Sequence, residues 1–483
     1  MISIFDKTQK KRNLILFSVT FLQACSLQPK VSLPKITLPQ TWQNTSLLQF
    51  DGKTQKDWWQ NFKQPQLDNL VATGLQENIE INIAYEKLRA SRIEKKIAYA
   101  ANMPEINGSA GYSRNYTSTA GIGDVLRPLL GLDQAGAYLE PQGVSYSNFN
   151  TGMFASWELD LWGRYKLMRK AAKANQQAFQ NDLNALSLSF EAEICRLYFL
   201  WVNLTHMAET EKKATDILKE IENINNASYQ RGFISQTVLL EQNSQFHKVF
   251  IKYQELDNAA QEVRRTLSML VYNRPDALSV NDQKFLPVDY RQITPPPLKI
   301  PSELVKVRPD IRAAEQRLHA AAAMVGIARA DFYPRITFSG ELSIDALTLT
   351  EFGWGARNTQ FGPTLTLPIF EGGKIARQVE LRQSEFKSAG LAYQQTVLNA
   401  WKEAEDALAN YNMTRNQYDN AVLIAQNAQN NEQKVGASYR RGDLSKAEFL
   451  ISQLTSLDAE IELLNIEQQL MNSYIRLYVV SGG

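Results

Sequence analysis

The chain has 483 residues, enough for two or three ordinary domains. Its 52 Lys and Arg residues nearly balance its 50 Asp and Glu residues, so bulk charge gives no reason to expect a nucleic-acid-binding protein. The sequence has no run of about 18 apolar residues, which argues against a membrane-spanning helix.

The first 25 residues have the composition of an export signal. Four basic residues within positions 7–12 precede a short apolar run over 14–22, too short to cross a bilayer as a helix. The following "LQAC" resembles a bacterial lipobox, so residues 1–24 are predicted to be a lipoprotein signal peptide and Cys25 the acylated N-terminus. The alternative is an ordinary signal peptide with a chance cysteine. Because Ser26 and not Asp follows the cysteine, the pattern favours the outer membrane.

The rest of the chain contains a repeated pattern, which indicates a tandem duplication. Ile81, Ala84 and Leu88 are matched 230 positions later, and "SYQRGFIS" at 228–235 is matched 210 positions later by "SYRRGDLS". Pro104 and Trp162 are 58 residues apart, but their counterparts Pro334 and Phe370 are only 36 apart, so the first copy carries about 22 extra residues there, which fits a longer loop. Each copy is predicted to contain a helix, two strands and then two long helices.

Four segments alternate apolar and polar residues with the period of a β-strand. They lie near residues 106–116, 149–161, 336–345 and 361–369. A soluble antiparallel sheet is one interpretation, but strands of about ten residues with one apolar face also suit a transmembrane β-barrel. The export signal favours the barrel. Four strands cannot close a barrel alone, so the chain is expected to oligomerise, and three copies would supply 12 strands.

Long helices are predicted after each strand pair. Residues 164–231 and 233–274 contain no Gly or Pro, and 374–441 contains only Gly390 and Gly436. A heptad pattern of mostly small residues predicts a close-packed helical seam, with Cys195 as a buried member. The predicted seam consists of Ala171, Ala174, Ala178, Asn181, Ala185, Leu188, Ala192, Cys195, Phe199 and Val202.

Each "SYxRG" segment interrupts a helical stretch and predicts a hairpin turn, at Gly232 and at Gly442. The duplication predicts that both turns lie at the same end of the molecule, opposite the strands. We refer to these turns as the first tip and the second tip.

Three longer segments resemble the TolC-like outer-membrane efflux proteins, in particular their lipidated, OprM-like branch. They are "WWQNFKQPQLDNLVATGLQEN" at 58–78, the segment 300–340 with its "RPDI" and "YPRITFSG" landmarks, and "YRRGDLSKAEFLISQLTSLDAEIELL" near the C-terminus. The resemblance implies an α+β membrane protein whose protomer has four β-strands and long α-helices. Three such protomers would form a 12-strand β-barrel continuous with a periplasmic α-helical barrel.

The resemblance also implies a division of the chain into segments. Beyond the signal peptide, it implies an N-terminal periplasmic belt segment at 25–65, a first repeat at 66–274, a belt connector at 275–301 and a second repeat at 302–483.

By resemblance, the protein is a passive exit duct of a tripartite efflux system in the outer membrane. An inner-membrane pump and a periplasmic adaptor would deliver small toxic compounds to a homotrimer. A duct needs no bond chemistry, so we expect neither enzymatic activity nor a metal or cofactor, apart from covalent lipid on Cys25. Two alternatives are a duct for protein secretion and a structural periplasmic coiled-coil lipoprotein without a pore. The substrate class stays open.

The resemblance places the gate of the duct at the tips. The expected tip and gate residues are Tyr229, Gly232, Tyr439, Arg440, Arg441, Gly442, Asp443 and Glu448. An Arg–Asp link known in the family is absent, because Leu444 and Val238 occupy those positions. Arg440, Arg441 and Asp443 are therefore expected to supply other gate contacts. In a trimer Glu448 would form a ring of three carboxylates, or else be an ordinary solvated helix residue.

Overall fold

The computed structural model describes residues 57–118, 143–279 and 301–482, with 27–34, 36–37, 39, 42, 285–286, 288, 290 and 293. Cys25 lies outside the described residues, and so does the predicted signal peptide. The chain forms two compact units, which are described separately. One includes Ile93–Lys173 and His319–Lys387, and the other includes Ser32–Arg92, Ala174–Leu318 and Ser388–Gly483, so both halves of the sequence contribute to each unit.

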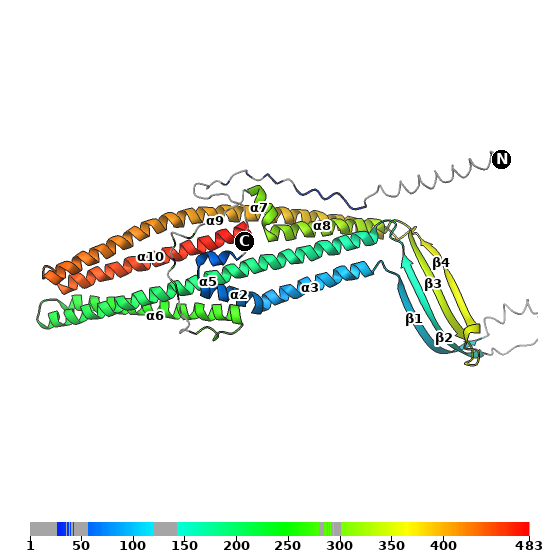
Figure 1. Ribbon diagram of the computed structural model, residues 1–483, viewed down its shortest axis with the longest axis horizontal. Coiled ribbons are helices and arrows are strands. Elements are labelled where there is room, and N and C mark those ends of the chain that lie inside the picture. The colour runs from blue at the N-terminus through cyan, green and yellow to red at the C-terminus, as the bar shows by residue number, and fades with distance from the viewer. Residues whose placement is uncertain are drawn as a thin grey trace, which may run out of the picture. The chain divides into compact units, whose positions relative to one another are not determined.

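The elements of both halves follow the predicted order of one helix, two strands and two long helices (Figure 1). The first half has η1 (Trp58–Phe62), α2 (Pro65–Glu77), α3 (Ile79–Ala100), β1 (Glu105–Ser118), β2 (Gly143–Glu158), α5 (Arg164–Gln230) and α6 (Gln236–Tyr272). The second has α7 (Pro301–Val307), α8 (Pro309–Ala330), β3 (Arg335–Ala346), η3 (Trp354–Ala356), β4 (Arg357–Thr366), α9 (Lys374–Arg441) and α10 (Lys446–Ser481). Among the described residues, no helix has a stretch apolar enough to cross a membrane.

The four strands form one antiparallel sheet in the order β1-β2-β3-β4. Met153 lies opposite Gly108 on one side and Leu342 on the other, whereas Phe154 lies opposite Asn107 and Glu341. Because paired residues share a face, this register gathers the apolar residues on one face and most polar residues on the other. The predicted alternation is therefore confirmed.

In the first unit, the turn between β2 and α5 packs against the turn between α8 and β3. Trp162, which precedes α5, donates from its indole N–H to the carbonyl of Pro334 at 2.6 Å and stacks on Tyr333 at 4.8 Å. Beside them, α8 approaches α5 closely, since a Cβ at Gly326 would lie 2.7 Å from the Leu167 side chain. These contacts tie the turn between β2 and α5 to the turn between α8 and β3.

The second unit has an aromatic core around the ends of α2 and α10. Trp58 stacks on Tyr478 with ring centroids 4.7 Å apart, and Phe62 meets Phe199 edge-on at 5.0 Å. The Tyr474 hydroxyl donates to the carbonyl of Ile293 at 2.7 Å. The segment before α2, the connector between the halves and the end of α10 therefore pack together in this unit.

The predicted seam along α5 is confirmed. Nine of its ten residues are buried, and Ala185 is half-buried. Cys195 is fully buried, and burial raises the pKa of its thiol, so it is a packing residue in a form unsuited to nucleophilic chemistry. At about 1.5 Å per residue, α5 alone is about 100 Å long.

Candidate functional site: the two helical tips

The first tip joins α5 to α6 through a glycine turn. Gly232 has a φ of 74°, and its N–H donates to the carbonyl of Tyr229 at 2.9 Å. Phe233 donates in the same way to Ser228 at 2.9 Å. Ser235 then caps α6, but its hydroxyl accepts from the N–H of Val238 at a long 3.5 Å. The glycine is needed because L side chains rarely adopt this left-handed conformation.

The second tip joins α9 to α10 with the same backbone turn. Gly442 has a φ of 84° and donates from its N–H to Tyr439 at 2.9 Å, while Asp443 donates to Ser438 at 3.0 Å. The equal geometry of the two turns confirms the hairpins predicted from the repeated "SYxRG" segments. The side chains around the second turn, however, make a network that the first turn lacks.

The charged residues of the second tip bind to one another within the turn. The Arg441 guanidinium donates to Asp443 and to the Ser438 hydroxyl, each at 3.0 Å. Arg440 is exposed and forms no ion pair with another described residue. The structure thus brings Arg441 and Asp443 together as a local pair, and a role in gating stays a prediction for all three.

Glu448 caps the start of α10. Its carboxylate accepts from the backbone N–H and the hydroxyl of Ser445, each at 2.8 Å, and its own N–H donates to that hydroxyl at 3.2 Å. These hydrogen bonds lower the pKa of the carboxyl, so the exposed group is firmly ionised. Glu448 therefore has a local structural partner, whatever charge it presents to a pore.

Close packing of α9 on α10 depends on one glycine. Tyr439 stacks on Phe449 with centroids 5.4 Å apart and ring planes within 7°. A Cβ at Gly436 would lie 2.9 Å from the Phe449 ring, closer than side-chain carbons normally approach. Gly436 could have been noticed in the sequence as a glycine inside a long helical pattern, which often marks a close approach.

The two hairpins also contact each other behind the tips. Lys446 at the start of α10 forms an ion pair with Glu220 on α5, and Glu220 raises the pKa of the lysine. A small cluster of Leu218, Ile221 and Leu450 is buried beside this pair. No spacing in the sequence predicts the Lys446–Glu220 contact, because its partners lie in different halves of the chain.

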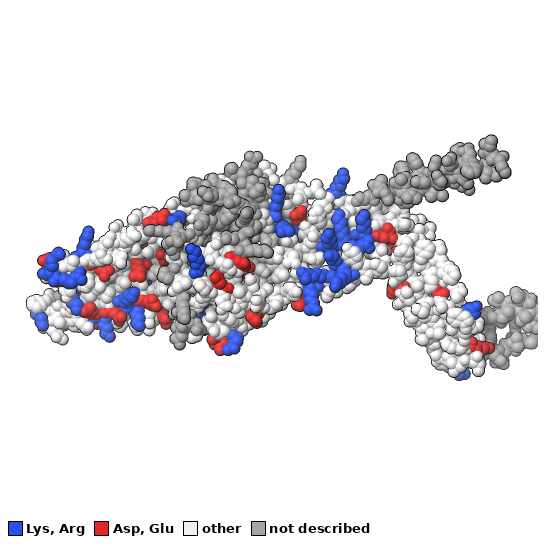
Figure 2. All heavy atoms as spheres, in the orientation of Figure 1, with Lys and Arg blue, Asp and Glu red and all other residues white. Residues whose placement is uncertain are grey.

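Basic residues are more numerous at the second tip. Arg440, Arg441 and Lys446 lie there, whereas Arg231 is the basic residue of the first turn. Figure 2 shows Lys and Arg side chains, in blue, at the end of the molecule where α9 meets α10. Among the described residues, no group of His, Cys, Asp and Glu is arranged to hold a metal ion.

Two half-buried carboxyl groups were missed by the sequence reasoning. Glu191 accepts a hydrogen bond from the indole N–H of Trp58 at 3.1 Å, and burial raises its pKa to about 7. Burial, with a smaller contribution from Glu460, likewise raises the pKa of Glu467 to about 7. Their burial depends on the aromatic core of the second unit, which no local pattern reveals.

Known proteins share this architecture over nearly the whole chain. Residues 70–271 and 300–483 match the family model described as outer membrane efflux protein. The chain is 26% identical to outer membrane protein OprJ of Pseudomonas aeruginosa over 96% of its length and 93% of the relative. It is 25% identical to cation efflux system protein CusC of Escherichia coli, covering 96% of each chain.

A solved structure gives the same result for the fold. The Campylobacter jejuni CmeC outer membrane channel superimposes with a TM-score of 0.81 at 24% identity, covering 95% of each chain. The duplicated protomer with one four-stranded sheet and paired long helices is thus the fold of outer-membrane channels. With the family model matching both halves, the chain belongs to the outer membrane efflux protein family.

Proposed function

We propose that three copies of this outer-membrane efflux protein close into one passive exit duct. The observation that carries this proposal is the sheet, whose apolar face is bare and whose edge strands, β1 and β4, have no further partner among the described residues. Phe361 is 84% exposed and Leu365 is 65% exposed on that face. Such a face suits lipid, and three sheets joined edge to edge would form a 12-strand barrel without open edges.

A stripe along α9 supports the same assembly. Each seam residue of α5 has a counterpart 210 positions later, and the counterparts of buried Asn181 and Leu188 are Leu391 and Leu398. Leu391 is 67% exposed and Leu398 is 37% exposed. Within the chain, α10 covers α5, as the Asn203 side chain donating to the carbonyl of Leu464 at 2.7 Å indicates. Because α9 is the second-half counterpart of α5, we expect the first-half helices of a second copy to cover α9 in the same way.

The duct would work with an inner-membrane pump and a periplasmic adaptor, and it would catalyse no reaction. Named relatives at similar identity include a cation efflux protein and a toluene efflux pump protein. Relatives this alike differ in substrate, which supports a conduit whose cargo is selected by its pump. We infer passive transport of small toxic compounds for this chain, in preference to protein secretion.

The tips are proposed as the closed entrance of the duct. The Arg441–Asp443 pair and the Lys446–Glu220 ion pair would hold the second hairpin in place, and the Glu448 carboxylates would line the entrance. Acylation of Cys25 would anchor the N-terminus in the membrane.

Accumulation of a fluorescent cationic dye tests the function in cells. Cells lacking the gene should accumulate more dye than wild type, and complementation should reverse the change. Equal accumulation in a strain without redundant efflux proteins would refute the transport of such compounds.

A further inference from the structure

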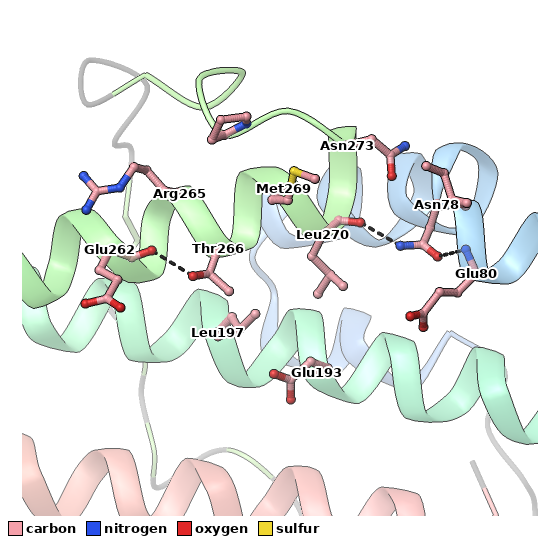
Figure 3. Close-up of a pocket in the computed structure, with 12 residues that line it drawn as sticks. Asn78, Glu80, Glu193, Leu197, Glu262, Arg265, Thr266, Met269, Leu270 and Asn273 are labelled. Atoms are coloured by element: carbon pink, nitrogen blue, oxygen red, sulfur yellow. Dashed lines mark hydrogen bonds between the residues drawn. The ribbon is translucent and has the colours of Figure 1, made fainter.

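A pocket with a volume of about 610 Å³ lies where α3 begins and α6 ends beside α5, within one compact unit (Figure 3). Leu197 and Met269 contribute apolar surface, and the charged lining consists of three carboxylates and one guanidinium, from Glu80, Glu193, Glu262 and Arg265. This volume lies in the range of small-molecule sites. An acidic and apolar lining suits a ligand that combines positive charge with apolar surface.

The second half of the chain shows what these carboxylates can hold. Counting by the repeat offsets, Glu80 corresponds to Asp310, and Glu193 corresponds to Glu403. Between the latter two lies the guanidinium of Arg308, which donates to Asp310 at 2.7 and 3.1 Å and to Glu403 at 2.8 Å. Arg308 is only 7% exposed. The protein therefore already binds a guanidinium at this position, using its own side chain.

At the position that corresponds to Arg308, the first half has an uncharged residue. Asn78 stands where Arg308 would be, and its side chain caps α3 by accepting from Glu80 N–H at 2.8 Å and donates to the Leu270 carbonyl at 3.0 Å. Glu193 is paired with Arg196 of its own helix at 2.6 Å, but Glu80 forms no ion pair with any described residue. In Figure 3 the Arg265 side chain extends away from Glu80.

We propose that this pocket binds a small organic cation that joins a guanidinium or amidinium head to an apolar body. The head takes the place of the Arg308 guanidinium and donates to Glu80 and Glu193. The apolar body lies against Leu197 and Met269. Such a charge-assisted, planar donor matches a carboxylate better than a compact ammonium does.

The repeat also argues that the pocket stays open when copies assemble. The counterparts of Glu262 and Thr266 in α10 are Asn472 and Arg476, and both are exposed although α5 packs beside α10. A neighbouring α9 placed in the same way against α6 would therefore leave Glu262 and Thr266 accessible.

Binding of p-aminobenzamidine to the purified full-length protein tests the proposal. Its fluorescence rises in apolar surroundings, and p-aminobenzamide is an uncharged control of the same shape. Glu80→Gln should weaken amidine binding about 10- to 100-fold, the usual cost of losing a charged hydrogen bond. Asn78→Arg should abolish binding by placing a guanidinium in the pocket, and Glu209→Gln, which changes an exposed carboxylate of α5 outside it, should change nothing.

Asn78→Arg also removes a helix cap, so circular dichroism must show that the variant is folded, and Glu80→Gln keeps the cap intact. The proposal is overturned if wild type fails to bind the amidine at millimolar concentration, or binds the amide equally well. It is also overturned if both variants bind like wild type. The assay measures neither conductance nor efflux, so a negative result leaves the proposed duct untouched.

Discussion

The two halves differ at the residue before the helix that leads to their strands. Asn78 precedes α3 in the first half, and Arg308 precedes α8 in the second half. Asn78 joins the start of α3 to α6 through a hydrogen bond to the Leu270 carbonyl, whereas Arg308 joins the start of α8 to α9 through an ion pair with Glu403. At the tips, too, the second half has the more extensive hydrogen bonding at the start of the following helix. The first turn has one long capping bond at Ser235, and the second has a reciprocal capping box at Ser445.

The comparison indicates what a duplication preserves. Periodicity and turn glycines reproduce the same backbone in both halves, because they depend on residue class more than on residue identity. The charged contacts at Asn78 and Arg308, and the caps at Ser235 and Ser445, have diverged between the halves.

The largest difference in unfolding free energy is expected between Arg308→Gln in the second half and Asn78→Ala in the first. Arg308→Gln leaves Asp310 and Glu403 without their buried guanidinium, which should cost about 2–4 kcal/mol of unfolding free energy. Asn78→Ala removes an uncharged cap and one hydrogen bond to the Leu270 carbonyl, and should cost about 1–2 kcal/mol. Denaturant unfolding of the detergent-solubilised protein compares the two, and equal losses would contradict the asymmetry.

Glu191→Gln should change the pH dependence of stability. The folded-state pKa of about 7 lies above the ordinary 4.5, so the folded protein binds the proton more tightly between these values. Stability should therefore fall as pH rises from about 4.5 to about 7 and change little above it. Glutamine still accepts from Trp58 but cannot ionise, so the variant should be about 1–3 kcal/mol more stable at pH 8.

Glu467 in the second half has a similarly raised pKa and serves as the comparison. Glu191→Gln and Glu467→Gln should each remove part of the loss of stability with rising pH, and the double variant should remove more than either. Thermal melts at pH 5 and pH 8 measure this. A wild-type melting temperature that rises over this range and is unaffected by both substitutions would count against the burial argument.

Gly436→Val should disturb the second tip and not the first. The new side chain would meet Phe449 and disrupt its stacking on Tyr439, at a cost of about 1–3 kcal/mol. The matched control is Asn226→Val, because Asn226 is the first-half counterpart of Gly436. Amide hydrogen exchange should quicken around the second tip only in the glycine variant. Equal quickening in both hairpins would show that the close approach is unimportant.

Capping substitutions should give the smallest difference. Ser445→Ala removes the hydroxyl that accepts from the Glu448 N–H and donates to its carboxylate, and should cost about 1 kcal/mol in the first turn of α10; the backbone N–H of residue 445 still donates to Glu448. Ser235→Ala loses one bond of 3.5 Å and should cost about 0.5 kcal/mol or less in α6. Local hydrogen exchange can resolve the two, and a larger loss for Ser235 would reverse the expected order.

Much of the fold could be predicted because its signals are local and repeated. Strand alternation identified β1 to β4, the absence of Gly and Pro identified the long helices, and Gly232 and Gly442 identified the turns. The seam around Cys195 followed from heptad spacing. Each of these depends on backbone conformation or on one helix face.

The contacts of the site were harder to predict because they join distant segments. Glu220 and Lys446 meet only after two hairpins pack, and Arg308 reaches Glu403 only when α8 lies against α9. The capping role of Glu448 is different. Ser445 followed three residues later by Glu is a readable capping signature, which the sequence reasoning passed over in favour of a pore ring.

Conductance of the purified protein in planar bilayers tests the central claim, a duct whose tips hold it closed, most directly. Wild type should form pores that are mostly closed, and Lys446→Gln should raise the open fraction about two- to fivefold, as expected for a surface ion pair. Lys402→Gln, which breaks a surface pair with Asp406 on α9, should behave like wild type. Absence of pores in every sample, or equal opening with and without Lys446, would contradict the account.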